Sequence, residues 1–170
     1  MQMSSPIKKL TVLAVLTALG IALQLLESYL PFLVNLPGGK LGLANIVTLI
    51  VLYLYGARAG FSVALLRSVL GALLFGGVVG MLYSVSGAVL ATAVMYFAKQ
   101  KLTKLSIVGV SVLGACMHSA AQVCVAGVLL SGVLIYTYLP ALLIVATVCG
   151  TFTGLAAKFA VQHMKRMERK

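Results

Sequence analysis

Six apolar stretches dominate the sequence, separated by short segments rich in glycine, proline or basic residues. A helix needs about 20 apolar residues to cross the hydrocarbon core of a bilayer, and the second stretch is short for such a span. Hydrophobic residues make up 62% of the 170 residues and charged residues 9%, so a soluble domain could not bury the apolar surface. We therefore predict an all-α integral membrane protein, a single domain over residues 1–170 with six transmembrane helices at 10–26, 43–55, 59–75, 78–98, 107–130 and 138–161.

The basic residues predict how these helices are oriented. Thirteen Lys and Arg face two acids, Glu27 and Glu168, for a net charge of +11. Loops rich in Lys and Arg lie on the cytoplasmic side of cell membranes. An even number of spans puts every basic cluster on one side together with both termini: Lys8, Lys9, Arg58, Lys99, Lys101, Lys104, Lys158, Lys165, Arg166, Arg169 and Lys170. We predict cytoplasmic N and C termini, and this clustering between apolar stretches argues against nucleic-acid binding.

Small residues recur on one face of the first predicted helix. Ala14, Ala18 and Ala22 stand four residues apart, a spacing that lets another helix approach closely. By spacing alone, the stripe is more typical of packing within the bundle than of docking to another protein. Both interpretations stay open, because spacing does not say to which chain the partner helix belongs.

An ionisable side chain inside the membrane costs at least about 2.5 kcal/mol, so Arg67 requires an explanation. It lies nine residues beyond Arg58, which at about 1.5 Å per residue places it near mid-membrane. Leu65, Leu66, Val69 and Leu70 flank it and leave no route to the surface along its own helix. Arg67 is expected to contact a ligand directly or through water, to pair with Glu27, or to bind helix-end carbonyls.

Further polar residues are expected at a similar depth. The predicted topology places them in the outer half of the membrane or near its middle: Lys40, Asn45, Ser84, Ser86, His118 and Gln122. His118 and Gln122 are four residues apart and share a helix face. A lone histidine in a membrane is more typical of a hydrogen bond between helices than of a ligand contact. The convergence of several polar residues nevertheless predicts a polar cavity open to the outside.

Motifs for catalysis are missing from the sequence. It contains no acidic pair of the DDxxD type, no Walker A sequence, no HExxH and no GxSxG. Two acids leave little for general acid–base chemistry. We predict no catalytic residues, no metal site and no cofactor, and any active transport would require ATPase partners.

Two segments resemble a known family. PGGKLGLANIVTLIVLYLYGARAGFSVALLRSVLGALLFGG, at 37–77, and LYSVSGAVLATAVM, at 82–95, resemble the Gx transporter family, whose members are often labelled heptaprenyl diphosphate synthase component I. The similarity covers nearly the whole chain and is most specific from Gly38 to Gly87. That family is in turn similar to the substrate-binding S components of energy-coupling factor (ECF) vitamin transporters, which have six helices and bind a transmembrane coupling protein and two ATPases.

The resemblance implies a function for several features. In S components a small-residue face on the first helix docks on the coupling protein, and Ala14, Ala18 and Ala22 match it. The first loop, here 28–42, covers the substrate site from outside. The resemblance implies a subunit of the bacterial cell membrane that captures a small anionic or aromatic compound, such as a vitamin, a quinone or an isoprenoid precursor. The substrate itself does not carry over. A non-catalytic subunit beside a synthase and an autonomous permease are the alternatives.

Overall fold

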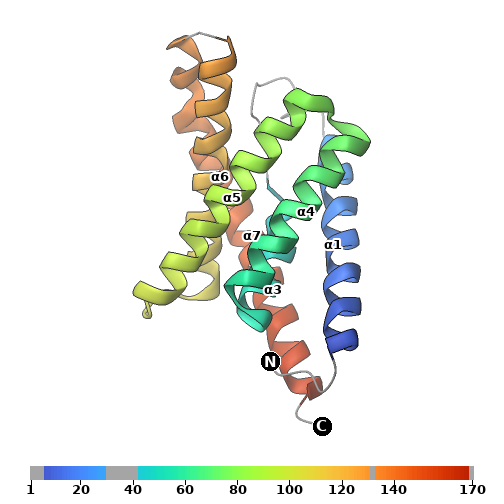
Figure 1. Cartoon of the computed structure of the whole chain (residues 1–170). Helices are drawn as coiled ribbons and strands as arrows, with labels where there is room; N and C mark the ends of the chain where they lie inside the picture. Colours follow the sequence, from blue (N-terminus) through green and yellow to red (C-terminus); the bar gives the residue numbers. More distant parts are fainter. Residues whose placement is uncertain (1–5, 30–41, 131–132, 169–170) are drawn as a thin grey trace.

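The computed structural model describes residues 6–29, 42–130 and 133–168. The regular elements in these ranges are helices (Figure 1): α1 (Pro6–Ser28), α3 (Asn45–Tyr55), α4 (Ala57–Phe75), α5 (Gly77–Lys101), α6 (Ile107–Leu130), the short 3-10 helix η1 (Val133–Tyr138) and α7 (Leu139–Glu168). Each predicted span corresponds to one α-helix. The all-helical fold class is therefore confirmed.

The first and last helices of the chain, α1 and α7, are longer than the apolar stretches predicted for them. α1 begins at Pro6 rather than near Leu10, and α7 continues to Glu168 instead of ending near Val161. Hydropathy detects only the part of a helix that lies in lipid, whereas backbone hydrogen bonding continues into the polar region. Lys165 and Arg166 in the last turn of α7 favour this extension, because cations are stabilising near helix C-termini.

Five segments are long and apolar enough to cross a membrane: α1, α4, α5, α6 and 135–167, which is mostly α7. With 11 residues, α3 is shorter. At 1.5 Å per residue it extends roughly 16 Å, about half of a hydrocarbon core of about 30 Å. A single residue, Gly56 with a φ of 86°, joins it to α4.

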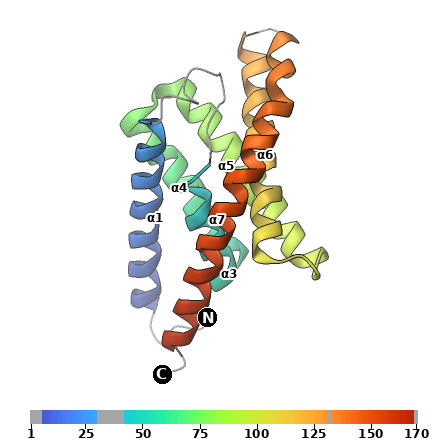
Figure 2. The ribbon, with the colours of Figure 1, turned by 180° about the vertical axis from the view of Figure 1, so that it is seen from behind.

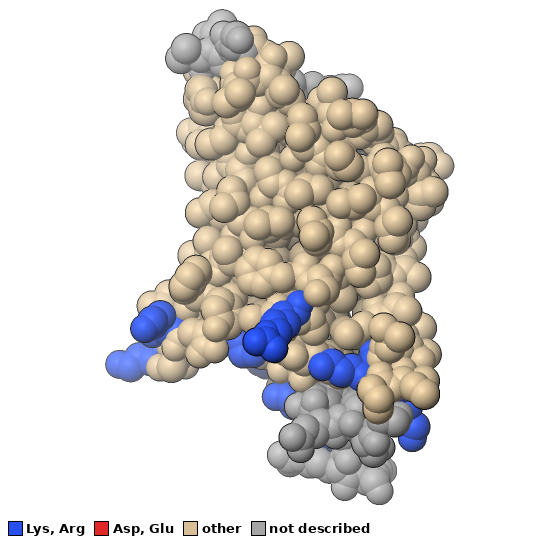
Figure 3. Space-filling view, viewed as in Figure 1, with Lys and Arg blue, Asp and Glu red and all other residues tan. Residues whose placement is uncertain are grey.

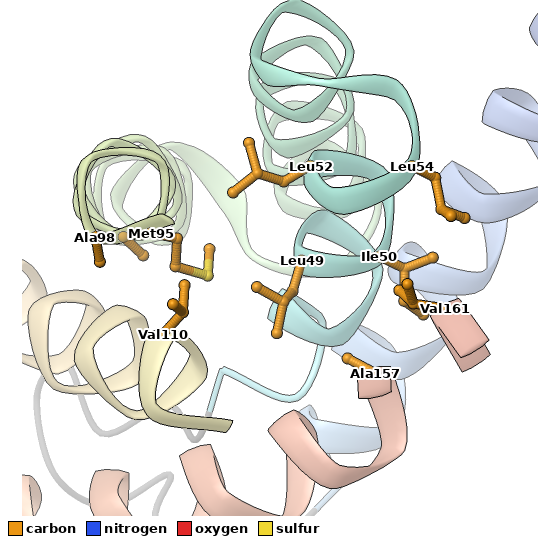
Figure 4. Close-up of a cluster of buried hydrophobic side chains, with 10 residues drawn as sticks. Leu49, Ile50, Leu52, Leu54, Met95, Ala98, Val110, Ala157 and Val161 are labelled. Atoms are coloured by element: carbon orange, nitrogen blue, oxygen red, sulfur yellow. The ribbon is translucent and has the colours of Figure 1, made fainter. Parts of the chain in front are cut away.

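The short helix α3 occupies the centre of the bundle. It contacts α1, α4, α5, α6 and α7, whereas α1 lies at the edge and packs mainly on α4 and α3. The views from the front and from behind agree on this arrangement (Figures 1 and 2). The main apolar core surrounds the C-terminal part of α3 (Figure 4), with Leu49 facing Met95 and Val110 from α5 and α6, and Ile50 beside Val161 from α7. This core lies in the half of the bundle that contains both termini.

Basic side chains gather at that same end of the molecule (Figure 3), where the chain begins and ends (Figure 1). Lys99 also serves the fold there. Its Nζ donates to the carbonyl oxygen of Leu52 at 2.8 Å and lies 4.7 Å from the ring centroid of Tyr53. It thus binds a C-terminal carbonyl of α3, whose partial negative charge favours a cation.

The arrangement of the helix ends predicts opposite labelling of two introduced cysteines. Lys101→Cys lies at the basic end and Ser28→Cys at the other end of α1, and both positions are exposed. In a background without Cys116, Cys124 and Cys149, a membrane-impermeant maleimide should label position 28 from outside and position 101 only from the cytoplasm. Labelling of both from one side would contradict the orientation of the bundle.

Candidate functional site

Polar side chains from five helices come together around the start of α3. We call these residues the polar cluster: Gln24 and Glu27 of α1, Asn45 and Thr48 of α3, Arg67 and Ser68 of α4, Ser84 of α5, and His118 and Gln122 of α6. All of them are buried except Gln24, which is half-buried. The contacts below connect all of them except Ser68, which follows Arg67 in the sequence.

Arg67 extends from α4 to the first turn of α3. It is 2% exposed. Its Nη2 donates to Asn45 Oδ1 at 2.7 Å, and its Nε donates to Thr48 Oγ1 at 3.2 Å. A Cβ atom on Gly20 would lie 3.0 Å from Arg67 Cδ, so the glycine gives the arginine stem room to pass α1. The side chain is thus fixed along its whole length.

Glu27 binds the non-helical backbone that precedes α3. Its Oε1 accepts from the amide of Gly42 at 2.7 Å, and its Oε2 accepts from the amide of Leu43 at 3.2 Å. Backbone at membrane depth needs such partners because lipid offers none. Glu27 also attracts Arg67 electrostatically, while the hydrogen bonds described for Arg67 go to Asn45 and Thr48. Pairing with Glu27, one of the three alternatives for Arg67, is thus an electrostatic attraction beside these hydrogen bonds.

His118 and Gln122 reach the cluster from α6 through close packing on two glycines. A Cβ atom on Gly87 of α5 would lie 2.7 Å from His118 Cε1 and 3.2 Å from Gln122 Cγ. One on Gly42 would lie 3.4 Å from His118 Cδ2. The imidazole therefore sits between α5 and the turn before α3, and any larger residue at position 87 would displace it.

Gln24 connects α1 to α4 and α5. Its Nε2 donates to Ser84 Oγ at 3.2 Å, and a Cβ atom on Gly71 would lie 2.8 Å from its Cδ. The contacts of Gln24, together with those of Arg67, Glu27 and His118, link α1, α4, α3, α6 and α5 to one another. The polar cluster is thus a ring of side chains inside the bundle rather than a line along one helix.

Several atoms of this ring have no hydrogen-bond partner among the residues that the structure describes. They are Gln24 Oε1, Asn45 Nδ2, Ser68 Oγ, and both Nε2 and Oε1 of Gln122, which is 0% exposed. Each buried polar group without a partner costs about 1–3 kcal/mol. Such groups are few in native proteins, and in the described residues several of them are concentrated in this one cluster.

The structure brings together most of the residues singled out in the sequence. Asn45, Arg67, Ser84, His118 and Gln122 all belong to the polar cluster. The structure does not bring Ser86 into it, because residues two apart on a helix do not share a face. Its Oγ donates to the carbonyl oxygen of Leu82 in its own helix at 2.7 Å. Lys40 lies outside the described residues, as does most of the loop expected to cover the site.

Sequence reasoning missed three members of the cluster: Gln24, Thr48 and Ser68. For two of them, the spacing from a residue already singled out could have indicated membership of the cluster. Thr48 is three residues after Asn45, on the same helix face. Gln24 is three residues before Glu27 in an otherwise apolar helix. Ser68 is next to Arg67, and only the packed structure shows that it is fully buried.

Ala14, Ala18 and Ala22 are exposed on α1. Spacing alone favoured their packing within the bundle, but the face of α1 that packs on α3 and α4 carries Thr17, Gly20 and Glu27 instead. The alanine stripe is therefore available to lipid or to another protein.

The fold and its apolar surface define a multi-pass α-helical membrane protein. A family model described as heptaprenyl diphosphate synthase component I matches residues 16–160, and the chain belongs to this family. Neither the curated proteins nor the solved structures include a match to the chain.

Arg67→Met should destabilise the protein, because it leaves Asn45 Oδ1 without its donor and Glu27 without its nearby cation. Breaking a buried charged network costs about 3–5 kcal/mol, so Tm measured in detergent should fall clearly. Arg58→Met on the exposed end of α4 is the matched control and should change little. Adding Glu27→Gln to Arg67→Met should not restore stability, because glutamine keeps only one of the two oxygens that accept from Gly42 and Leu43. Equal Tm values for the two arginine variants would contradict the network.

Gln122→Met should leave the ligand-free protein as stable as the wild type or more stable. The substitution keeps most of the volume and removes two buried amide atoms that lack partners among the described residues. Gln100→Met, at an exposed position on α5, is the matched control. A lower Tm for Gln122→Met alone would indicate that the amide is bonded within the protein itself.

Proposed function

We propose that this chain is the membrane substrate-binding subunit of an ECF-type importer, similar to an S component. The concentration of buried, unpartnered polar atoms in the ring of Gln24, Asn45, Ser68 and Gln122 carries this proposal. Such a ring inside an apolar bundle suits the capture of a small polar molecule.

The short α3 supports a transport role. Transporters commonly place their sites where a membrane helix is interrupted, because the helix N-terminus and the adjoining backbone then face the substrate. Here α3 begins next to Arg67, and the turn before it is bound by Glu27. The interruption and the polar cluster coincide.

The substrate in this proposal is a small anionic or aromatic compound, such as a vitamin, a quinone or an isoprenoid precursor. Arg67 and Lys40 would supply positive charge, and Asn45, Ser84, His118 and Gln122 would supply hydrogen bonds. Catalysis is not proposed. Of the two acids in the sequence, Glu27 is engaged with backbone amides and Glu168 lies at the end of α7.

Transport would require a transmembrane coupling protein and ATPase subunits, since the sequence carries no Walker A motif. The exposed stripe of Ala14, Ala18 and Ala22 is the proposed docking face for the coupling protein. Its small side chains would let a partner helix come close to the backbone of α1.

A non-catalytic membrane subunit of a heptaprenyl diphosphate synthase is the second candidate, and the family name favours it. The two functions require different partners, and a prenyl chain-elongation assay distinguishes them. If the chain is an importer subunit, adding it to a soluble prenyl synthase should leave chain elongation unchanged. A strict requirement for it in elongation would favour the synthase.

The direct test is native mass spectrometry of the gently purified full chain. A substrate-binding subunit should retain a small molecule, and Arg67→Lys should reduce its occupancy because an ammonium cannot reproduce the guanidinium fork. A chain that carries only phospholipid, in several lipid environments, would speak against the proposal.

Ala18→Trp separates docking from internal packing. Because Ala18 is exposed, the variant should keep its Tm and its bound molecule. Uptake by cells that contain the partner subunits should fall strongly, since the indole keeps the partner helix away. Ala156→Trp, at an exposed alanine of α7, is the control and should not reduce uptake. Loss of Tm in Ala18→Trp would contradict the docking role.

A further inference from the structure

Among the described residues, Gln122 is a buried side chain with both a donor and an acceptor that lack hydrogen-bond partners. It is fully buried, and both its Nε2 and its Oε1 lack partners among the described residues. Its stem lies against Gly87, and α6 holds it on the same face as His118. The position of the side chain is thus set by packing, while neither the donor nor the acceptor of its amide is bonded to a described residue.

This pair of atoms restricts the chemistry of a partner. A carboxamide offers one donor group and one acceptor side by side in a plane. A single partner meets both only if it presents an acceptor next to a donor, as an adenine edge does to a glutamine in the major groove of DNA. A carboxylate accepts only, so it would leave Oε1 without a donor.

The other groups of the polar cluster also bear on the chemistry of the bound molecule. Among the described residues of the polar cluster, Arg67 is opposed by Glu27, which attracts it electrostatically. Glu27 thus offsets the charge of Arg67, and Lys40, outside the described residues, is the further positive charge expected at the site. Asn45 Nδ2 and Gln24 Oε1 add one more donor group and one more acceptor.

We infer that the molecule bound in this ring is a nitrogen heterocycle of the lactam, imide or amino-heterocycle class, whose donor–acceptor edge pairs with Gln122. The inference rests on the proposed substrate-binding function and narrows its substrate class. Gln122 is the residue that selects for this edge, and Arg67 and Asn45 bind elsewhere on the same molecule.

A matched pair of probes tests this inference: quinazoline-2,4-dione and its 1,3-dimethyl derivative. Methylation removes both N–H donors and keeps the ring and both carbonyl acceptors. In titrations of the full chain in nanodiscs, the wild type should bind the parent compound roughly ten- to a hundredfold more tightly, because the methylated compound leaves Oε1 unpaired. Gln122→Met should bind both compounds equally, and Gln100→Met should behave as the wild type.

Equal binding of both probes by the wild type, or binding of neither, would overturn the inference. So would a preference that persists in Gln122→Met, whose Tm shows whether it is folded. Mass spectrometry separates this failure from a failure of the proposed function. A retained small molecule without a donor–acceptor edge defeats the inference and leaves substrate binding standing, whereas a chain with no retained small molecule counts against both.

Discussion

The fold depends on how α3 is held at its two ends inside the membrane. The helix covers only about half of the hydrocarbon core, so its ends and the turn before it must find polar partners within the protein. Glu27 accepts from two amides on the N-terminal side, and Lys99 donates to Leu52 near the C-terminus. Both charges have the sign that the helix dipole favours. A carboxylate from α1 and an ammonium from α5 thereby hold the central helix.

This arrangement divides the bundle into two halves. Towards the termini, α3 is surrounded by an apolar core with Leu49, Leu52 and Met95. Around the first turn of α3 and on its N-terminal side, polar side chains occupy the space between the helices. Gly42, Gly71 and Gly87 give these side chains room. The half towards the termini provides the apolar core, and the half at the start of α3 provides the hydrogen-bonding groups. This polar region follows from a helix that begins only at Asn45, part-way along the bundle, rather than from an added domain.

The helix α1 contributes to two separate surfaces. Its inner face places Gln24 and Glu27 in the polar cluster, and its outer face exposes Ala14 and Ala18. In the proposed importer these surfaces would serve the substrate and the coupling protein. A single edge helix, packed mainly on α3 and α4, would then connect the two binding events. The same exposed face would suit a synthase partner in the second candidate function.

The sequence by itself determined the helices, their approximate ends, the clustering of basic residues and the buried position of Arg67. These features depend on composition along the chain: apolar length sets a span, and an arginine among leucines cannot reach water along its own helix. Tertiary structure alone decided that Ala18 faces outward, that Ser84 rather than Ser86 joins Gln24, and that Ser68 and Gln122 are fully buried. The physical reason is that lipid is as apolar as a protein core. Hydrophobicity therefore does not distinguish the two faces of a membrane helix, and only contacts between helices do.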